Sequence, residues 1–542
     1  MVVFFLSVSI LPAANLFRPA AIGPHFDWPD ETMNFFFAKQ FAETRQFRAS
    51  NENEFIRPRS FNIFHGSLVP GGFLGLPLLY GAGIWIISLP GKNLGVLISL
   101  FFTSTLAATA LLAFAGLSRR IIGRRQAILA ALLLAANPIY WYYSAYSFLP
   151  NVPFFAFAIF SIYFFMIGLT RGDCWRYGLA TIGGFCAAIA LAIRSNETLW
   201  LIMSGAAAIT MLRLWRNWRY LAVAAIATLI FFAPILYFQN LTFGGAFATG
   251  YSRFTSAGIF QPTEFSGAAS SPLSIAWRAL TLPYGLHPRV IWFNFKNAWS
   301  ALGFFSSVSL AAAAFWFIAK REKTIAHKAF SAVLVIVTVW LTIAYGSWVT
   351  SDPLMTKLNT IGLPHLRYFL PVLALASLPL ANFVGSLLES RSRVAKMGAA
   401  VFIAVFVSLS AAAVFWQNPD SLIHVATRIR SYNKAAGMVS EKTPSRAVVI
   451  TDRTDKEIFS DREVTPSIPS KVDGTLAALD SVICKRPVYF YLSDSRMQDG
   501  ALAELLDHWQ IPKESDQEIK PIVEPRRGYH LREMNRSECK TN

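Results

Sequence analysis

Long apolar segments alternate with short polar connections along most of the chain. A helix needs about 17–25 apolar residues to cross a hydrocarbon core of about 30 Å. Segments near that length lie at about 94–117, 126–145, 152–169, 177–194, 197–212, 220–239, 299–319, 329–350, 367–388 and 397–416, and a shorter one lies at 2–20. The pattern predicts an all-α polytopic membrane protein with about 11 transmembrane helices.

The segment 70–90 is also apolar, but it is interrupted by prolines and glycines. It contains Pro70, Gly71, Gly72, Pro77 and Pro90. Proline and glycine interrupt a spanning helix, so we expect this segment to be re-entrant or interfacial. If segment 70–90 does not span the membrane, the loops rich in Lys and Arg all fall on one side of it.

Five short connections carry most of the basic residues of the apolar part. They contain Arg119, Arg120, Arg124, Arg125, Arg171, Arg176, Arg213, Arg216, Arg219, Lys320, Arg321, Lys323, Lys328, Arg391, Arg393 and Lys396. Cytoplasmic loops are enriched in Lys and Arg. The sequence therefore predicts a multi-pass protein of the plasma or inner membrane, with a cytoplasmic N-terminus and an extracytoplasmic C-terminal domain.

Composition and charge support this division. Of 542 residues, 54% are hydrophobic and 15% are charged, whereas soluble domains carry about 25% charged residues. The net charge of +18 lies entirely in residues 1–416, with 30 Lys and Arg against 12 Asp and Glu, while residues 417–542 hold 19 of each. We expect a transmembrane domain over 1–416 and a soluble domain over 417–542. A basic stripe typical of nucleic-acid binding is not evident.

The C-terminal part has the pattern of a small α/β domain. Residues 417–435 predict an amphipathic helix, residues 447–451 and 488–492 predict buried strands, and residues 499–510 predict a helix. The charged residues Asp452, Arg453, Asp455 and Lys456 follow the first strand, at the end where α/β sheets often bind ligands. A solvated loop is the alternative interpretation.

Three predicted external segments, 21–93, 240–298 and 351–366, are too long to be simple connections. In the first, Asp30 and Glu31 begin a helical pattern whose aromatic face we expect to lie flat on the bilayer. Acids at a helix start are explained by capping and the helix dipole alone. Alternatively, carboxylates at this level can hold a divalent cation or take a proton from a hydroxyl.

Other external side chains offer binding groups. Arg253, Arg289, Lys357 and Arg367 would form a cationic rim suited to a lipid phosphate, although single arginines at a membrane surface also simply extend towards headgroups. Candidate residues for substrate contact are Tyr251, His287, His365, Tyr368 and Asn151. The external histidines lack metal-ligand spacing, and no nucleotide-binding motif is present.

Several stretches in order resemble the GT-C class of multi-spanning glycosyltransferases, which includes protein O-mannosyltransferases and lipid A aminoarabinose transferases. The stretches are Asp30-Glu31, the Arg119–Arg125 loop, Ala136–Tyr140 through Phe148–Pro153, Asn240–Tyr251 and Arg367–Pro371. The resemblance covers roughly residues 1–416. It implies a GT-C-like fold and transfer of a sugar from a polyprenyl phosphate to a lipid, glycan or protein outside the cytoplasm, with inversion.

The resemblance implies that Asp30 is the general base for the acceptor hydroxyl and that Glu31 is its neighbour in the site. Related enzymes often carry an acid in the short loop before the fourth span, where this chain has Asn151. Metal use therefore stays open between a cation such as Mg²⁺ or Mn²⁺ at Asp30 or Glu31 and no metal.

Two other classes of function are compatible with many spans. A transporter or lipid flippase needs polar residues near the bilayer midplane, commonly between repeated halves. The predicted spans contain few acids, and no repeated half is evident. A non-catalytic scaffold would tolerate the loss of both Asp30 and Glu31.

Overall fold

The structure is a computed structural model, and its elements group into two compact units. It describes residues 1–18, 22–50, 56–89, 94–253, 285–319, 324–348, 360–451, 454–459, 461–466, 482, 485–493, 517–519 and 529–533. One unit, called here the helical unit, comprises Met1–Ser9, Phe101–Tyr237 and Thr255–Ile423. The other, the mixed unit, comprises Ile10–Leu100, Phe238–Phe254 and His424–Asn542. The predicted domain boundary after Trp416 stays a prediction.

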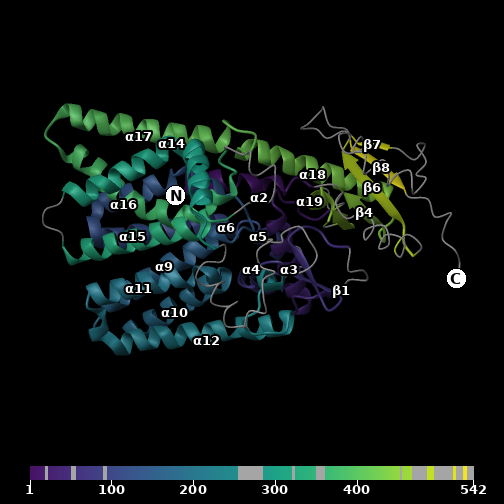
Figure 1. Ribbon diagram of the computed structural model, residues 1–542, viewed down its shortest axis with the longest axis horizontal. Helices are drawn as coiled ribbons and strands as arrows, with labels where there is room; N and C mark the ends of the chain where they lie inside the picture. Colours follow the sequence, from purple (N-terminus) through teal and green to yellow (C-terminus); the bar gives the residue numbers. More distant parts are fainter. Residues whose placement is uncertain are drawn as a thin grey trace. The chain divides into compact units, whose positions relative to one another are not determined.

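The helical unit is built from long helices that run alongside one another (Figure 1). The long helices are α6 (Phe102–Ile122), α7 (Arg124–Ala135), α9 (Asn151–Leu169), α10 (Trp175–Ile193), α11 (Thr198–Met211), most of α12 (Trp218–Phe243), α14 (Pro288–Ala319), α15 (Ile325–Gly346), α16 (Leu370–Glu389) and α17 (Arg393–Phe415). The unit also contains the short helices α1 (Val2–Val8) and α8 (Pro138–Tyr143). The short helices η1 (Ser195–Glu197), η2 (Leu214–Asn217) and η5 (Pro364–Phe369) connect them.

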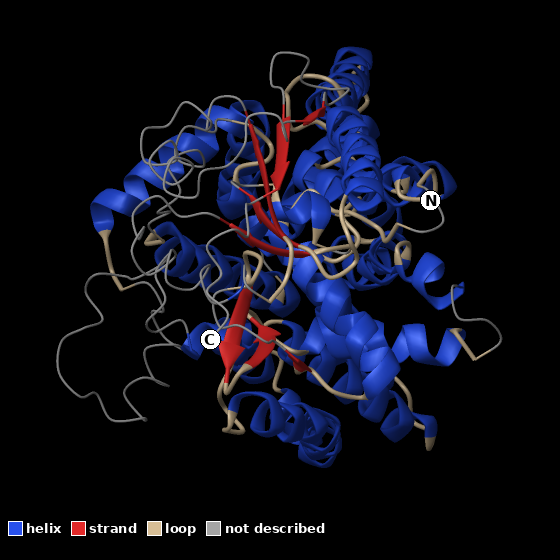
Figure 2. Cartoon of the chain, turned by 90° about the vertical axis from the view of Figure 1, so that its right-hand side faces the viewer, coloured by secondary structure: helices blue, strands red, loops and turns tan. Residues whose placement is uncertain are grey.

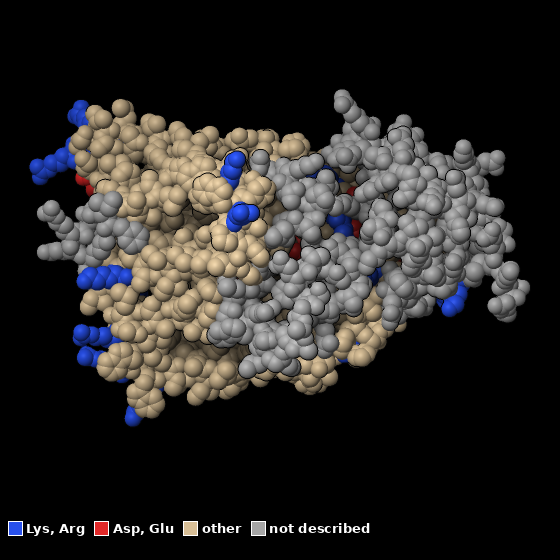
Figure 3. All heavy atoms as spheres, in the orientation of Figure 1, with Lys and Arg blue, Asp and Glu red and all other residues tan. Residues whose placement is uncertain are grey.

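Within the described residues, 8 helices are long and apolar enough to cross a membrane. They include α6, α9, α10, α12, α14, α15, α16 and α17. In the view of Figure 3, Lys and Arg side chains gather at one end of the helical unit and leave the sides of its helices almost free of charge. This distribution is that of a membrane protein, as the sequence predicts.

Three of the predicted spans are shorter in the structure than expected. Residues 2–20 contain α1 and the five-residue helix α2 (Ile10–Ala14), and α11 has 14 residues. The predicted span 126–145 is broken at Asn137, whose side chain accepts hydrogen bonds from the backbone N–H groups of Ile139 and Tyr140 and so begins α8. The Asn-Pro sequence at this position is a helix-start signal.

The first predicted external segment folds as part of the mixed unit. Its elements are α3 (Pro29–Thr44), β1 (Ala49–Ser50), β2 (Phe61–Phe64), β3 (Ser67–Pro70) and α4 (Gly75–Ile87), and α5 (Leu94–Ser99), at the start of the predicted span 94–117, follows in the same unit. The strands form an antiparallel sheet in the order β1-β3-β2. His65 and Gly66, both with positive φ, join β2 to β3 as a two-residue hairpin turn. The 13-residue helix α4 is the part of segment 70–90 that is helical.

The aromatic face of α3 is covered by protein, whereas the sequence pattern predicts that it rests on the bilayer. Phe37 and Phe41 are at most 6% exposed, and they pack in one core with Phe47, Phe61 and Phe243. The face was identified correctly, but the hairpin that buries it was not predicted. Packing of the hairpin and α4 on this face fixes the start of α3 in the mixed unit.

The C-terminal part of the mixed unit contains most of α18 (Leu422–Lys442) and a second sheet (Figure 2). The sheet has the order β5-β4-β6-β8-β7, with strands β4 (Val448–Thr451), β5 (Glu463–Pro466), β6 (Val488–Ser493), β7 (Gln517–Ile519) and β8 (Tyr529–Glu533). Strands β4, β5 and β6 are parallel, and β7 and β8 are antiparallel to their neighbours. The two predicted strands are confirmed, while the predicted helix 499–510 lies outside the described residues.

Candidate active site

Helix α3 presents two carboxylates in its first turn. Pro29 occupies its first position, where a missing N–H costs nothing, and Trp28 is the N-cap residue without a side-chain capping bond. The N-cap residue therefore supplies no side-chain cap, and the helix dipole favours the negative charge of Asp30 and Glu31 in the first turn.

The two carboxylates have different surroundings. Asp30 is partly exposed, and its Oδ1 accepts a hydrogen bond of 2.8 Å from the hydroxyl of Ser60. Glu31 is only 2% exposed. Successive residues of a helix point about 100° apart, which explains why Glu31 turns into the core while Asp30 stays at the surface. Of the two, Asp30 is the carboxylate that is accessible to solvent.

A third acid, Asp27, is held by cations from the C-terminal part of the same unit. Its carboxylate lies 3.1 Å from Arg428 and 3.4 Å from Lys456, and Tyr432 donates a hydrogen bond to it. Burial alone would raise the pKa of Asp27, but Lys456 and Arg428 outweigh burial and lower it. Asp27 is therefore an ionised, structurally paired acid in the segment that leads to α3.

Tyr251 lies in the same unit, in the short helix η3 (Gly250–Arg253). Gly250 donates its N–H to the carbonyl of Gly72 and accepts a hydrogen bond from the side chain of Asn62. A Cβ atom at Gly250 would lie 2.3 Å from the backbone of Gly71, so only glycine permits this approach. The ring of Tyr251 then rests 5.0 Å from that of Phe73, beside the hairpin.

The helical unit gathers a second group of predicted residues. Asn151 donates a side-chain hydrogen bond to the carbonyl of Arg367, and the guanidinium of Arg367 donates to the hydroxyl of Tyr368. The ring of His365 lies tilted beside that of Trp348, at 4.9 Å between ring centroids. Asn151, His365 and Arg367 are buried, which shows that they are packed against protein rather than extended towards headgroups.

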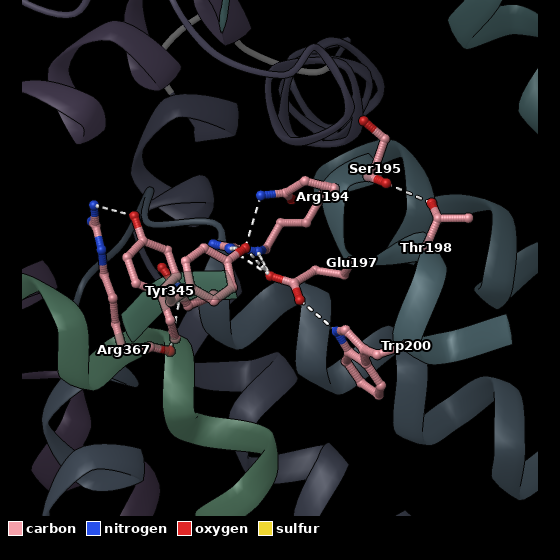
Figure 4. A network of polar contacts seen from close by, with 10 residues as sticks. Arg194, Ser195, Glu197, Thr198, Trp200, Tyr345 and Arg367 are labelled. Carbon is pink, nitrogen blue, oxygen red and sulfur yellow. Dashed lines mark hydrogen bonds and ion pairs between the residues drawn. The ribbon is translucent and has the colours of Figure 1, made fainter. Parts of the chain in front are cut away.

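Beside this group lies a buried polar network that the sequence analysis missed (Figure 4). Arg194 and Glu197 form an ion pair at 2.6 Å, and the hydroxyl of Tyr345 donates to Glu197 at 2.5 Å. Trp200 donates its indole N–H to the other oxygen of Glu197. Both charged residues are at the ends of apolar segments, and a charged pair near a membrane span is a signal that could have identified them.

Aromatic rings connect the network to the predicted residues. The rings of Tyr345 and Tyr368 are stacked at 4.2 Å and 2°, and the guanidinium of Arg194 lies 4.8 Å from the centre of the Tyr368 ring. Trp348 contacts the edge of Tyr368. Tyr368 is therefore placed between Arg194 and Arg367, with its ring fixed by its neighbours.

The remaining predicted residues are less well placed. The backbone N–H of His287 donates to the hydroxyl of Ser347, one residue before Trp348. Arg289 is exposed in the first turn of α14. Lys357 and the side chain of Arg253 lie outside the described residues. The candidates thus fall into one group in each unit, with Asp30, Glu31 and Tyr251 in the mixed unit.

The sequence alone does not decide between a bound metal ion and no metal. Among the residues that the structure describes, no three His, Cys, Asp or Glu side chains are grouped so that they could hold a metal ion. Asp30 is engaged by a hydroxyl, and Glu31 is turned into the core. The described residues around Asp30 therefore do not fit a protein-built metal centre.

Comparisons with known proteins bear on the fold. Residues 82–238 match the family model described as dolichyl-phosphate-mannose-protein mannosyltransferase. The crystal structure of ArnT from Cupriavidus metallidurans bound to undecaprenyl phosphate is similar over 98% of this chain and 96% of its own, at 13% identity and a TM-score of 0.51.

A second solved structure is the Archaeoglobus fulgidus oligosaccharyltransferase tethered with an acceptor peptide. It is similar over 91% of this chain and 68% of its own, at 13% identity and a TM-score of 0.50. A search of curated protein sequences found no match. At such identities, the likeness to the solved structures concerns the fold.

Proposed function

The chain is a membrane protein with the fold of the GT-C class of glycosyltransferases, as its sequence predicts, and we propose that it transfers a sugar from a polyprenyl-phosphate donor. The acceptor is a hydroxyl-bearing lipid or glycan, or a protein. Transfer takes place on the extracytoplasmic face of the plasma or inner membrane, with inversion at the anomeric carbon. The sugar is a hexose or a pentose.

The observation that carries this proposal is the placement of Asp30. It is a partly exposed carboxylate at the N-terminal end of a helix whose aromatic face is fixed by a core, and its Oδ1 accepts a hydrogen bond from a hydroxyl group. A general base needs such a combination of access and fixed direction. Glu31 is buried beside Asp30 in the same helical turn, and we propose that it is the neighbour of Asp30 in the site.

In the proposed reaction, the acceptor oxygen attacks the anomeric carbon of the donor sugar while Asp30 takes the hydroxyl proton. The new carbon–oxygen bond forms as the bond between the sugar and the phosphate oxygen breaks. The electron pair of that bond leaves with the polyprenyl phosphate. Attack from the face opposite the phosphate inverts the anomeric carbon, and Asp30 afterwards returns its proton to water.

The departing phosphate requires positive charge. Among the described arginines of the predicted rim, Arg367 has a guanidinium fixed beside Tyr368, whereas Arg289 is exposed. Fixed donors stabilise a developing charge better than mobile ones, because they need no reorganisation during the reaction. We propose that Arg367, Arg289, Arg253 and Lys357 bind the phosphate, and that Tyr251, His287, His365, Tyr368 and Asn151 are candidate substrate contacts.

The test uses the full-length protein purified in detergent, supplied with labelled polyprenyl-phosphate sugars and candidate acceptors. Transfer is followed by mass spectrometry. Asp30→Asn should lower the rate by at least about 100-fold, the usual value of a general base. Glu43→Gln, which neutralises an exposed acid on the same helix, is the matched control and should leave the rate unchanged. Equal rates in Asp30→Asn and the control would refute the mechanism.

The same assay tests whether sugar transfer needs a divalent cation. Excess chelator that leaves the rate unchanged would show transfer without a cation. Loss of activity that Mg²⁺ or Mn²⁺ restores would show a cation whose remaining ligands come from the donor phosphate or from other parts of the chain. A flippase, by contrast, would move the labelled lipid without consuming it and would be insensitive to Asp30→Asn.

A further inference from the structure

A short helix from the C-terminal part of the mixed unit contacts the segment that carries Ser60. This helix is α19 (Asp455–Ile458), followed directly by Phe459. Asp455 accepts hydrogen bonds from the backbone N–H of Arg59 at 2.8 Å and from its guanidinium at 2.6 and 2.8 Å. The carboxylate of Asp455 is 1% exposed, so this pair is largely shielded from water.

The second contact of the same helix falls on the other side of Ser60. The ring of Phe459 lies 4.8 Å from that of Phe61 and 5.2 Å from that of Phe36 on α3. The rings of Phe36 and Phe61 are themselves 5.5 Å apart. Asp455 and Phe459 therefore hold the residues before and after Ser60, and Phe459 also ties them to the helix that carries Asp30.

Ser60 itself has an unusual backbone. Its φ is 67°, in the left-handed region that residues other than glycine seldom adopt. Its carbonyl accepts a hydrogen bond from the N–H of Gly71, and its hydroxyl donates to Asp30. A strained conformation persists only when its surroundings impose it, and such residues cluster at functional sites. Here the surroundings are the contacts made by Asp455, Phe459 and Gly71.

This arrangement has a chemical consequence for a general base. A hydrogen bond to Oδ1 restricts rotation about the Cβ–Cγ bond of Asp30, so both carboxylate oxygens keep their directions. Proton transfer depends steeply on the alignment of base and hydroxyl. The hydroxyl of Ser60 is therefore placed to set the direction of Asp30 before an acceptor arrives.

We propose that Ser60 is a positioning residue for Asp30 and that α19 fixes Ser60 through Asp455 and Phe459. The proposal rests on the proposed function, in which Asp30 is the base. It makes Asp455 and Phe459 part of the support of the catalytic base, although neither touches the reacting atoms.

Two substitutions at Ser60 separate its hydroxyl from its backbone. Ser60→Gly removes the hydroxyl and relieves the positive φ, whereas Ser60→Ala removes the hydroxyl and keeps the strain. Both should lower kcat by about 10- to 100-fold while the KM for the donor stays within about twofold, because a misdirected base slows the chemical step without weakening binding. Thermal unfolding should show that Ser60→Gly is at least as stable as the wild type.

Variants of Asp455 and Phe459 test whether these residues act on Asp30 through Ser60. Asp455→Ala and Phe459→Leu should each lower kcat, and the double variant Ser60→Gly/Asp455→Ala should be no slower than Ser60→Gly alone, because both changes act through one hydrogen bond. Asp461→Asn is the matched control. It weakens the contact between Asp461 and His25, at 3.3 Å, which also joins the C-terminal part to the first segment without touching Ser60. It should leave kcat unchanged.

The outcomes distinguish this inference from the function on which it rests. Wild-type protein that transfers no sugar, or an active Asp30→Asn, removes the proposed function. An active wild type with an inactive Asp30→Asn and a fully active Ser60→Gly overturns the positioning role alone. Equal loss of kcat in Asp455→Ala and Asp461→Asn would show that general docking of the C-terminal part matters, and would overturn the path through Ser60.

Discussion

Arg194 and Glu197 form an almost fully buried ion pair in which the closest atoms are 2.6 Å apart. Tyr345 and Trp200 add hydrogen bonds to the pair, and Asn196 donates to the hydroxyl of Tyr345, so both charged partners keep polar contacts away from water. Removing one member of such a pair leaves a buried charge without its counterion, which costs about 3–5 kcal/mol. The pair therefore ties α10, α11 and α15 together at one place.

We expect Glu197→Ala to lower the thermal stability of the protein strongly, because Arg194 would stay buried without its partner. Thermal unfolding in detergent, followed by tryptophan fluorescence, measures the effect. The double variant Arg194→Met/Glu197→Leu should recover much of the loss, since apolar residues of similar volume often replace buried pairs well. A double variant as unstable as Glu197→Ala would show that the aromatic packing, rather than the charge balance, holds this region.

The pairing of Asp27 predicts a pH dependence. Lys456 and Arg428 lower its pKa in the folded state despite burial, so the unfolded chain binds this proton more readily. The contribution to stability is thus complete at neutral pH and is lost as the pH falls below about 4. Asp27→Asn should cost about 1.5–3 kcal/mol at pH 7, and the difference from the wild type should shrink towards pH 3.

Thermal unfolding between pH 3 and 7 measures this difference. The matched control is Asp173→Asn, which removes the exposed pair with Arg171 and should change stability by well under 1 kcal/mol at every pH. A gap between Asp27→Asn and the wild type that stays constant with pH would contradict the assignment.

Gly250 offers a test of the loop that carries Tyr251. An alanine there would place its Cβ 2.3 Å from Gly71 and 2.4 Å from the carbonyl oxygen of Pro70, both backbone atoms that cannot turn away. We expect Gly250→Ala to destabilise the protein by about 1–3 kcal/mol and to reduce transfer by displacing Tyr251. Gly245→Ala is the control, because its Cβ would meet only Ala248 at 3.5 Å, an ordinary contact.

The proposed orientation can be tested with a native thiol. Cys174 is exposed in the connection between α9 and α10, which we expect to be cytoplasmic from the positive-inside rule. In a chain carrying Cys484→Ser and Cys539→Ser, a membrane-impermeant maleimide should label Cys174 only after cells are permeabilised. Labelling in intact cells would reverse the orientation and move Asp30 to the cytoplasmic face.

Local patterns in the sequence predicted most of the helical unit, because a long apolar run has few alternatives to a spanning helix. They missed the break before α8, although Asn137 and Pro138 form a recognisable helix start. They also missed the hairpin β2–β3, since one of its two turn residues is His65, which is uncommon at positive φ. Without the hairpin, the aromatic face of α3 was assigned to lipid.

The candidate site was predicted only in part, for a different reason. Asp30 and its helix are a local feature of the sequence, and so are Arg367 and Tyr368. The contact between Arg59 and Asp455 joins residues 396 positions apart, and no periodicity in a single sequence encodes such a pair. Arg194 and Glu197 were passed over because each follows or begins an apolar run and was counted with it.

The contact between Asp455 and Arg59 can form only late in the synthesis of the chain. A ribosome that has delivered Asp30 and Ser60 to the membrane must still translate nearly four hundred codons before the clamping carboxylate exists. Nascent chains and prematurely terminated products therefore contain Asp30 and Ser60 without the contacts of Asp455. Under the proposed function, such incomplete chains should transfer sugar more slowly than the complete protein.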